Sequence, residues 1–303
     1  SNNPFAGNTA PEFVFANTIS GGLSLNIGER TGEVATLQEF GQPADALTLE
    51  MAFTSDVLPE SMGGNGTVLA SYAVPGTHNE FLVFAQSNGQ LAVFVNGKRT
   101  QLDVDSNALF DGQPHHLAIT LDSDTGAIEA YVDGTLAGTG ATTAGQPVQP
   151  GGTLTLGQEQ DSVGGSFDPQ QEFAGEIHNL QVFNAVRDGD DIAESASNLT
   201  VDASAPNLIA GFSFTGDTPL ENVVGSETIA LTGATITSQT IGEDSPLVAT
   251  LQEPLAGSGL VVNEGADTGE GALIPDVDLP TDALTAEVSF SSTNPPAPGE
   301  TNG

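Results

Sequence analysis

The feature that most constrains the fold is a succession of short runs in which apolar and polar residues alternate, separated by glycine-containing turns. This period of two places every second side chain on one face of a strand. The pairs Asn96-Gly97 and Asp133-Gly134 lie between such runs and favour two-residue hairpin turns, which need positive φ. The pattern predicts an all-β fold, a sandwich or jelly roll. Strands are expected at 68–73, 81–85, 91–95, 117–121, 128–132, 153–156 and 180–183, and a short helix at 188–195.

The charge of the chain is strongly one-sided. The 303 residues include 40 Asp and Glu but only 4 Lys and Arg, which gives a formal net charge of −36 at pH 7. Because like charges repel, we expect neither nucleic acid nor an anionic membrane as a partner, whereas cations are favoured. The apolar share of 38% is enough for a buried core, and the lack of cysteine excludes thiolate metal sites.

Part of the sequence occurs twice. Residues 22–55 align without a gap with residues 259–292, at an offset of 237, and 16 of the 34 pairs are identical. A match of this length in one register indicates a tandem repeat. We therefore expect residues 1–203 to form a sandwich that lacks its first strands, and residues 204–303 to begin a second copy, with a linker near 198–206.

Residues 207–237 have no counterpart ahead of residue 1 in the first copy. They can supply the missing strands either by folding back within their own chain or by pairing with a neighbouring molecule, and either pairing satisfies an open sheet edge. Strand donation from head to tail does not close on itself, so it predicts self-association into a fibre. The remaining interpretation is that the sequence is trimmed from a longer chain.

An acidic, glycine-rich loop spans residues 157–177, GQEQDSVGGSFDPQQEFAGEI, and contains no lysine or arginine. Calcium takes six to eight oxygen ligands, and carboxylates and carboxamides at this spacing can wrap around one ion. Without a cation, Glu159, Asp161 and Asp168 would repel one another. The alternative is a solvated polar loop, which is the usual state of a charged surface run.

The same loop closely resembles the calcium loop of pentraxins. Residues 116–123, HLAITLDS, are similar to the pentraxin signature His-x-Cys-x-Ser/Thr-Trp-x-Ser, with Ala118 and Leu121 at the cysteine and tryptophan positions. Residues 125–138, TGAIEAYVDGTLAG, look like a hairpin shared by pentraxins and laminin-G-like modules. The resemblance covers about residues 10–200 and implies a concanavalin A-like jelly-roll β-sandwich.

The resemblance also implies a set of calcium ligands. Residues 71–84, SYAVPGTHNEFLVF, match the segment that supplies the family's remaining ligands, but His78 stands where the family usually has aspartate. Imidazole is a poor ligand for a hard cation, so one of the family's two ion positions is expected to be weaker or lost. Asp168 replaces a glutamate. The implied ligands are the side chains of Asn79, Glu159, Asp161, Asp168 and Gln171, with the main-chain carbonyl of Gln160.

No arrangement typical of catalysis is found, so we do not expect an enzyme. The paired carboxylates of related glucanases are absent, as are a nucleophile elbow and a Walker loop. Residues 103–107 and 122–126 contain fragments of calcium-loop patterns and are expected to be turns. His115 and His116 are adjacent on a strand, so their imidazoles point to opposite faces and cannot chelate together.

Two functions of different classes fit the sequence. The first is a calcium-stabilised structural or adhesive repeat of a large extracellular or cell-surface protein of bacterial type, favoured by the tandem repeat. The alternative is a calcium-dependent, lectin-like module that binds glycans or phosphate-bearing headgroups. A sugar site usually includes an aromatic platform, yet the chain has no Trp and only two Tyr residues, Tyr72 and Tyr131.

Overall fold

The structure is a computed structural model, and it describes residues 13–14, 21–27, 31–41, 45–62, 64–215, 218–237 and 250–251. The chain divides into two compact units, one of which is Ile19–Gln239. In the other unit, made of residues 1–18 and 240–303, β1 (Phe13–Val14) pairs with β19 (Thr250–Leu251). The repeat copy at 259–292 and the tail at 294–303 lie outside the described residues.

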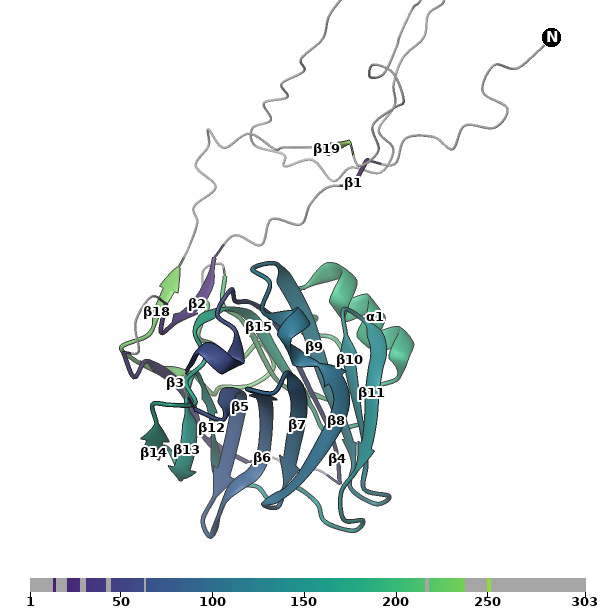
Figure 1. The fold of residues 1–303 in the computed structure, drawn as a ribbon. Helices are drawn as coiled ribbons and strands as arrows, with labels where there is room; N and C mark the ends of the chain where they lie inside the picture. Colours follow the sequence, from purple (N-terminus) through teal and green to yellow (C-terminus); the bar gives the residue numbers. More distant parts are fainter. Residues whose placement is uncertain are drawn as a thin grey trace, which may run out of the picture. The chain divides into compact units, whose positions relative to one another are not determined.

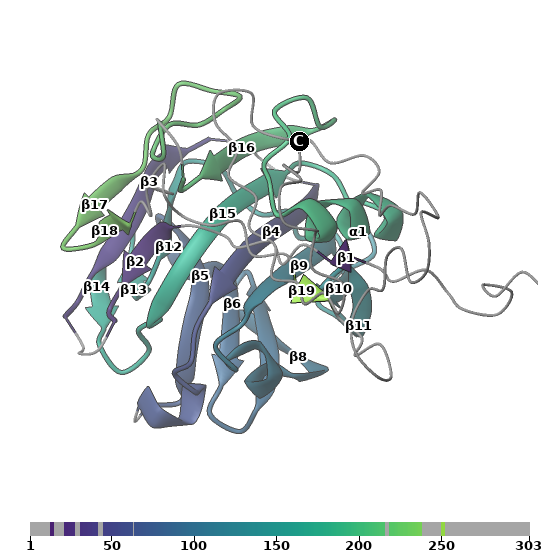
Figure 2. The ribbon, with the colours of Figure 1, turned by 90° about the horizontal axis from the view of Figure 1, so that it is seen from above.

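The unit Ile19–Gln239 is a sandwich of two antiparallel sheets (Figures 1 and 2). The first sheet has the order β11 (Thr135–Ala141), β10 (Ala127–Val132), β9 (Pro114–Asp122), β4 (Ala46–Thr54), β15 (Gly175–Phe183), β2 (Gly22–Leu25) and β18 (Thr235–Thr237), with β16 (Leu208–Ser213) also paired to β15. The second has the order β17 (Ala230–Thr232), β3 (Val34–Phe40), β12 (Gly152–Leu156), β5 (Gly66–Val74), β6 (Thr77–Gln86), β7 (Gln90–Val95) and β8 (Lys98–Asp105).

Smaller elements join these strands. Two 3-10 helices, η1 (Pro59–Met62) and η2 (Ser106–Leu109), follow β4 and β8, and the hairpin β13 (Glu159–Ser162) and β14 (Gly165–Asp168) follows β12. The helix α1 (Gly189–Asn198) begins after Asp188, whose carboxylate accepts from the Asp191 N–H as an N-cap. None of the helices in the described ranges is long and apolar enough to cross a membrane.

The predicted all-β jelly-roll sandwich is confirmed. Each expected strand lies within an observed one, and the expected helix at 188–195 overlaps α1. Alternate residues of the strands meet between the sheets, where Phe53 and Phe173 pack edge to face with their ring centroids 5.7 Å apart. At the two predicted hairpins, Asn96 and Asp133 both have positive φ, as the two-residue turns require.

The strands of residues 208–237 fold back onto their own chain. In this segment β16 pairs with β15, β17 with β3, and β18 with β2, so it adds strands to both sheets. Phe212 and Phe214 are fully buried in the core. The compact unit therefore extends to Gln239, past the boundary expected at residue 203. That boundary was placed by the composition of the 198–206 segment, which carries no information about long-range strand pairing.

A buried polar cluster attaches α1 to the outer face of the first sheet. Glu50 is fully buried, and its carboxylate contacts the Arg187 guanidinium and lies 3.1 Å from His116 Nε2. Arg187 also stacks 4.3 Å from the centroid of the Phe183 ring and donates to Ser195 Oγ in α1 at 2.8 Å. The imidazole of His115 instead bonds to the carboxylates of Asp111 and Asp133, so the two adjacent imidazoles have different partners.

Replacing Arg187 should strongly destabilise the sandwich. The change Arg187→Ala leaves the Glu50 carboxylate buried beside a single imidazole, and breaking a buried ion pair in this way costs about 3–5 kcal/mol. Urea unfolding followed by far-ultraviolet circular dichroism measures the change. Lys98→Ala, which removes an exposed cation, should cost less than about 0.5 kcal/mol. Equal unfolding midpoints for the two variants would contradict a structural role for this cluster.

Candidate functional site

The acidic loop folds into the hairpin of β13 and β14. Glu159 lies opposite Asp168 in the hairpin register, and Gln160 lies opposite Phe167. Directly opposed residues share a face, so the two carboxylates lie on one side of the hairpin, and the Gln160 side chain lies on the other. The strands are joined by a tight turn at residues 163 and 164, where Gly164 adopts the positive φ of 67° that the turn requires.

The side chain of Gln160 fixes the hairpin to the second sheet. Its Nε2 donates to the carbonyls of Ser71 at 2.7 Å and Thr153 at 2.9 Å, and its Oε1 accepts from the Gly164 N–H at 2.8 Å. The side chain is fully buried and all of these bonds are internal. Its amide is therefore committed to the scaffold, which leaves the main-chain carbonyl as the group through which Gln160 could bind a metal.

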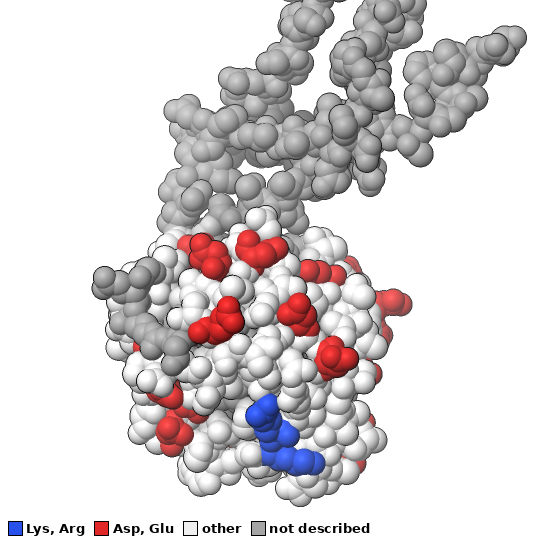
Figure 3. All heavy atoms as spheres, in the orientation of Figure 1, with Lys and Arg blue, Asp and Glu red and all other residues white. Residues whose placement is uncertain are grey.

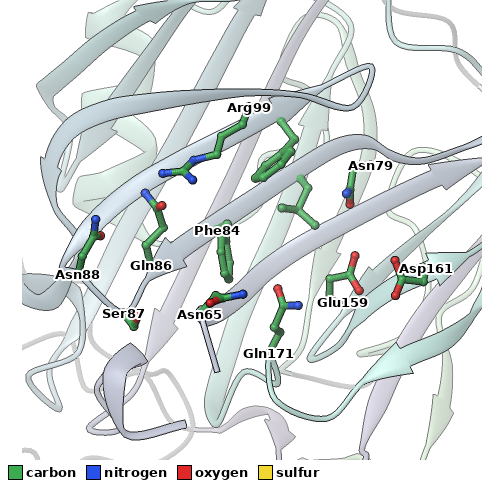
Figure 4. Close-up of a pocket in the computed structure, with 12 residues that line it drawn as sticks. Asn65, Asn79, Phe84, Gln86, Ser87, Asn88, Arg99, Glu159, Asp161 and Gln171 are labelled. Carbon is green, nitrogen blue, oxygen red and sulfur yellow. The ribbon is translucent and has the colours of Figure 1, made fainter. Parts of the chain in front are cut away.

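The amide side of the site comes from Asn79, at the start of β6, and from Gln171. The Oδ1 atom of Asn79 is buried without a hydrogen-bond partner in the described structure. Gln171 Nε2 donates to Asp168 Oδ2 at 2.7 Å, and the Asp168 carbonyl accepts from the Gln171 N–H at 3.0 Å. Asp168 thus orients Gln171, and Gln171 lines the same hollow as Glu159 and Asn79 (Figure 4).

Glu159 is the most perturbed carboxyl group of the site. Its side chain is buried, and Oε2 has no hydrogen-bond partner among the described residues. Burial, followed by the charges of Asp161 and Asp168, raises the pKa of Glu159 to about 7. Asp161 itself is exposed, with His78 Nε2 3.8 Å from its Oδ1. Within the described part of the chain no cationic side chain forms an ion pair with Glu159, so the site carries negative potential that a bound cation would relieve.

These residues fit a hard cation that prefers oxygen. Asn79, Glu159, Asp161 and Gln171 line one hollow, and Asp168 stands beside it through its bond to Gln171. Among the described residues there is no group of three or more Asp, Glu, His or Cys side chains placed to hold a metal. The fit therefore depends on a mixed set of carboxylate, amide and main-chain oxygens, which is a set that calcium accepts.

The hollow continues from this acidic end across the outer face of the second sheet (Figure 4). Its volume is about 540 Å³, within the range of small-molecule sites. Leu82, Phe84 and Phe94 form an apolar wall, and Arg99 lies beyond it. The remaining lining residues are polar: Asn65, Gln86, Ser87 and Asn88.

The sequence did not indicate these additional lining residues. Phe84 and Phe94 belong to strands with apolar residues on both faces, so periodicity could not tell which aromatic rings point outward. Only the adjacent basic pair Lys98-Arg99, in a chain with 4 basic residues, could have pointed to this face. The low counts of tyrosine and tryptophan argued against an aromatic platform for a sugar. In the structure, Phe84 and Phe94 place aromatic rings in the hollow instead.

The fold and the site together define a lectin-like class of β-sandwich. Residues 30–210 match the family model of the Pentaxin family, and the chain belongs to that family. This confirms the resemblance drawn from the acidic loop. The match ends inside β16, although the compact unit continues to Gln239.

Similar proteins include neuronal pentraxins. The chain is 40% identical to mouse neuronal pentraxin-2 over 131 residues, which cover 43% of this chain and 30% of the relative. It is 39% identical to human neuronal pentraxin-1 over 140 residues, 46% of this chain and 31% of the relative. The chain thus spans about a third of the length of these relatives. A heptameric SAP-like pentraxin from Limulus polyphemus has a similar fold, with a TM-score of 0.56 at 20% identity over 75% of this chain and 99% of that one.

Proposed function

We propose that this chain is a calcium-dependent, lectin-like binding module that acts outside the cell, and that it has no catalytic role. The observation that carries the proposal concerns two buried oxygens, Asn79 Oδ1 and Glu159 Oε2. Neither accepts a hydrogen bond in the described structure, and both residues lie at one end of a hollow large enough for a small ligand. A buried polar atom without a partner is costly, and a bound cation would satisfy both atoms. The family membership supports the same function.

In this proposal, the side chains of Asn79, Glu159, Asp161, Asp168 and Gln171 and the carbonyl of Gln160 hold one calcium ion. When bound, the ion would supply positive charge to which a hydroxyl or anionic oxygen of a ligand can bind. His78 is exposed beside Asp161 and replaces an oxygen ligand of the family pattern. We therefore expect one strong ion position, with a second that is weak or lost.

Calcium should stabilise the protein specifically. At a free concentration one hundred times its Kd, a ligand that binds only the folded state adds about 2.7 kcal/mol. Thermal unfolding in excess calcium and in chelator, at equal ionic strength, measures this gain. Asp161→Asn should lose most of it, whereas Asp103→Asn, which removes the same charge from an exposed position of β8, should retain it. An equal gain in both variants would show that calcium acts only by screening charge.

A second candidate is a structural or adhesive repeat in a larger surface or filament-forming protein. The sequence repeat of 22–55 at 259–292 favours it. In that case calcium would stiffen the module and no ligand would bind, so calcium-dependent stability without retention on any glycan favours this candidate. Self-association between neighbouring repeats would have to use surfaces other than the edges that residues 208–237 occupy in their own chain.

A further inference from the structure

Arg99 is an unusual cation in this chain. Of the other basic residues within the described ranges, Arg187 is held by Glu50, and Lys98 Nζ donates to Thr143 Oγ1 at 3.3 Å. Arg99 Nη2 donates to Gln101 Oε1 at 3.0 Å, and among the described residues no carboxylate lies within ion-pair distance of it. In a chain of net charge −36, this guanidinium is available to a ligand anion.

The position of Arg99 places this cation at the end of the hollow opposite to the acidic loop. Figure 4 shows its side chain beyond Phe84, on the far side from Glu159 and Asp161. Figure 3 shows basic atoms gathered in one patch on this face, where the other charged atoms are acidic. The hollow therefore has a proposed calcium ion at one end and a guanidinium at the other.

The surface between the two ends suits a sugar chain. Across the strands Arg99 pairs with Phe94, and Phe94 with Leu82, so Arg99 lies two strand spacings, about 10 Å, from β6. The apolar wall offers contact to the C–H faces of sugar rings, and the amides of Asn65 and Gln86 offer hydrogen bonds to hydroxyls. A ligand that spans the hollow must therefore be elongated, partly apolar and partly hydroxylated.

We infer that this hollow selects an acidic glycan with two anionic groups, one bound at the calcium end and one paired with Arg99. The inference rests on the proposed calcium-dependent function and adds the ligand class and Arg99 as its specificity-determining residue. An anionic lipid bilayer is a poorer occupant, because its flat surface would face many acidic side chains at once, whereas an oligosaccharide contacts only the hollow. A planar guanidinium binds a carboxylate or sulfate with two parallel hydrogen bonds, which favours acidic over neutral sugars.

Isothermal titration calorimetry with a hyaluronan tetrasaccharide and with its carboxyl methyl ester tests the inference. In excess calcium, the acid should bind at least about tenfold more tightly than the ester, because a hydrogen bond to a charged group is lost in the ester. The carboxylate at the calcium end supplies part of this preference, so Arg99→Gln should reduce the preference by the part that Arg99 supplies, whereas Lys98→Gln, in the neighbouring position, should retain it in full. Calcium should stabilise Arg99→Gln as much as the unchanged protein.

The outcomes separate the inference from the function on which it rests. Equal binding of acid and ester, a preference that is unchanged in Arg99→Gln, or a preference reduced equally in Lys98→Gln would overturn the role of Arg99. If neither sugar binds while calcium still stabilises the protein, the ligand class is overturned. Absence of any calcium-dependent stabilisation would instead refute the proposed function itself.

Discussion

A chain that ends at residue 203 should fail to fold, whereas a chain that ends at Gln239 should unfold cooperatively. The shorter chain loses β16, β17 and β18, and with them Phe212 and Phe214 from the core. Removing one buried phenylalanine side chain costs about 3–5 kcal/mol, and two exceed half of the usual stability of a domain. The loss also leaves β15, β2 and β3 with unpaired edges.

Circular dichroism and limited proteolysis of the two chains test this expectation. Phe212→Ala in the full chain provides a graded version, since it leaves the strand pairing in place and should lower the free energy of unfolding by about 3–5 kcal/mol. Val224→Ala, an exposed position in the same segment, is the matched control and should change it by less than about 0.5 kcal/mol. A cooperative unfolding transition in the chain that ends at 203 would show that the returning strands are dispensable.

Without calcium, the protein should lose stability as the pH rises through neutrality, because of Glu159. The pKa of Glu159 in the folded state is about 7, above the 4.5 of the free side chain. Between these values the folded state binds more protons than the unfolded state, so the free energy of unfolding falls with rising pH. The full difference amounts to about 3 kcal/mol, and it should be reached just above pH 7.

The measurement is chemical unfolding from pH 5 to pH 8 in chelator, compared with Glu159→Gln. The pKa of His178 is lowered by burial, so protonation of that residue destabilises the fold at the acidic end and acts in the opposite direction. Glu80, whose pKa burial raises, acts in the same direction as Glu159. Both remain in the variant, so the difference curve isolates Glu159. A flat difference curve would contradict the raised pKa.

Calcium should abolish this pH dependence. A bound cation stabilises the ionised carboxylate and replaces the proton, so the unchanged protein should be no less stable at pH 8 than at pH 6 when calcium is in excess. Glu159→Gln should gain little from calcium at any pH. Glu80→Gln is the control, because Glu80 accepts from the Gln149 N–H and does not line the hollow, and it should keep the calcium response.

The sequence predicted individual strands and hairpins better than it predicted the pairing of strands that are distant in sequence. The alternation in 117–121 and the turn at Asp133-Gly134 determine strands and hairpins through neighbouring residues, and both agree with the structure. The pairing of β18 with β2 joins residues more than 200 positions apart. Short strands such as 230–232 and 235–237 give almost no periodic signal, so their partners could be recognised only in three dimensions.

In the candidate site, too, the residues of one local segment were found from the sequence, and the residues brought together from different strands were not. The acidic residues were recognised because their loop resembles the pentraxin calcium loop, and the structure places Glu159 and Asp168 in one register pair. The apolar wall and Arg99 were missed because they lie on three different strands, and because an outward-facing phenylalanine in a strand buried on both sides looks like a core residue. The proposed ligand class depends on those missed residues.

The pairing of β2 with β18 also has a mechanical consequence. Thr237 lies opposite Gly22, and the Gly22 N–H donates to Thr237 Oγ1 at 3.1 Å, so the polypeptide enters and leaves the sandwich at adjacent points. Tension applied to the chain on both sides of the sandwich would break the β2–β18 hydrogen bonds one after another, starting at Gly22 and Thr237. It would not load all of these bonds at the same time, as a shearing force does. Such a load would be borne first by β2 and β18, and neither of these strands lines the hollow.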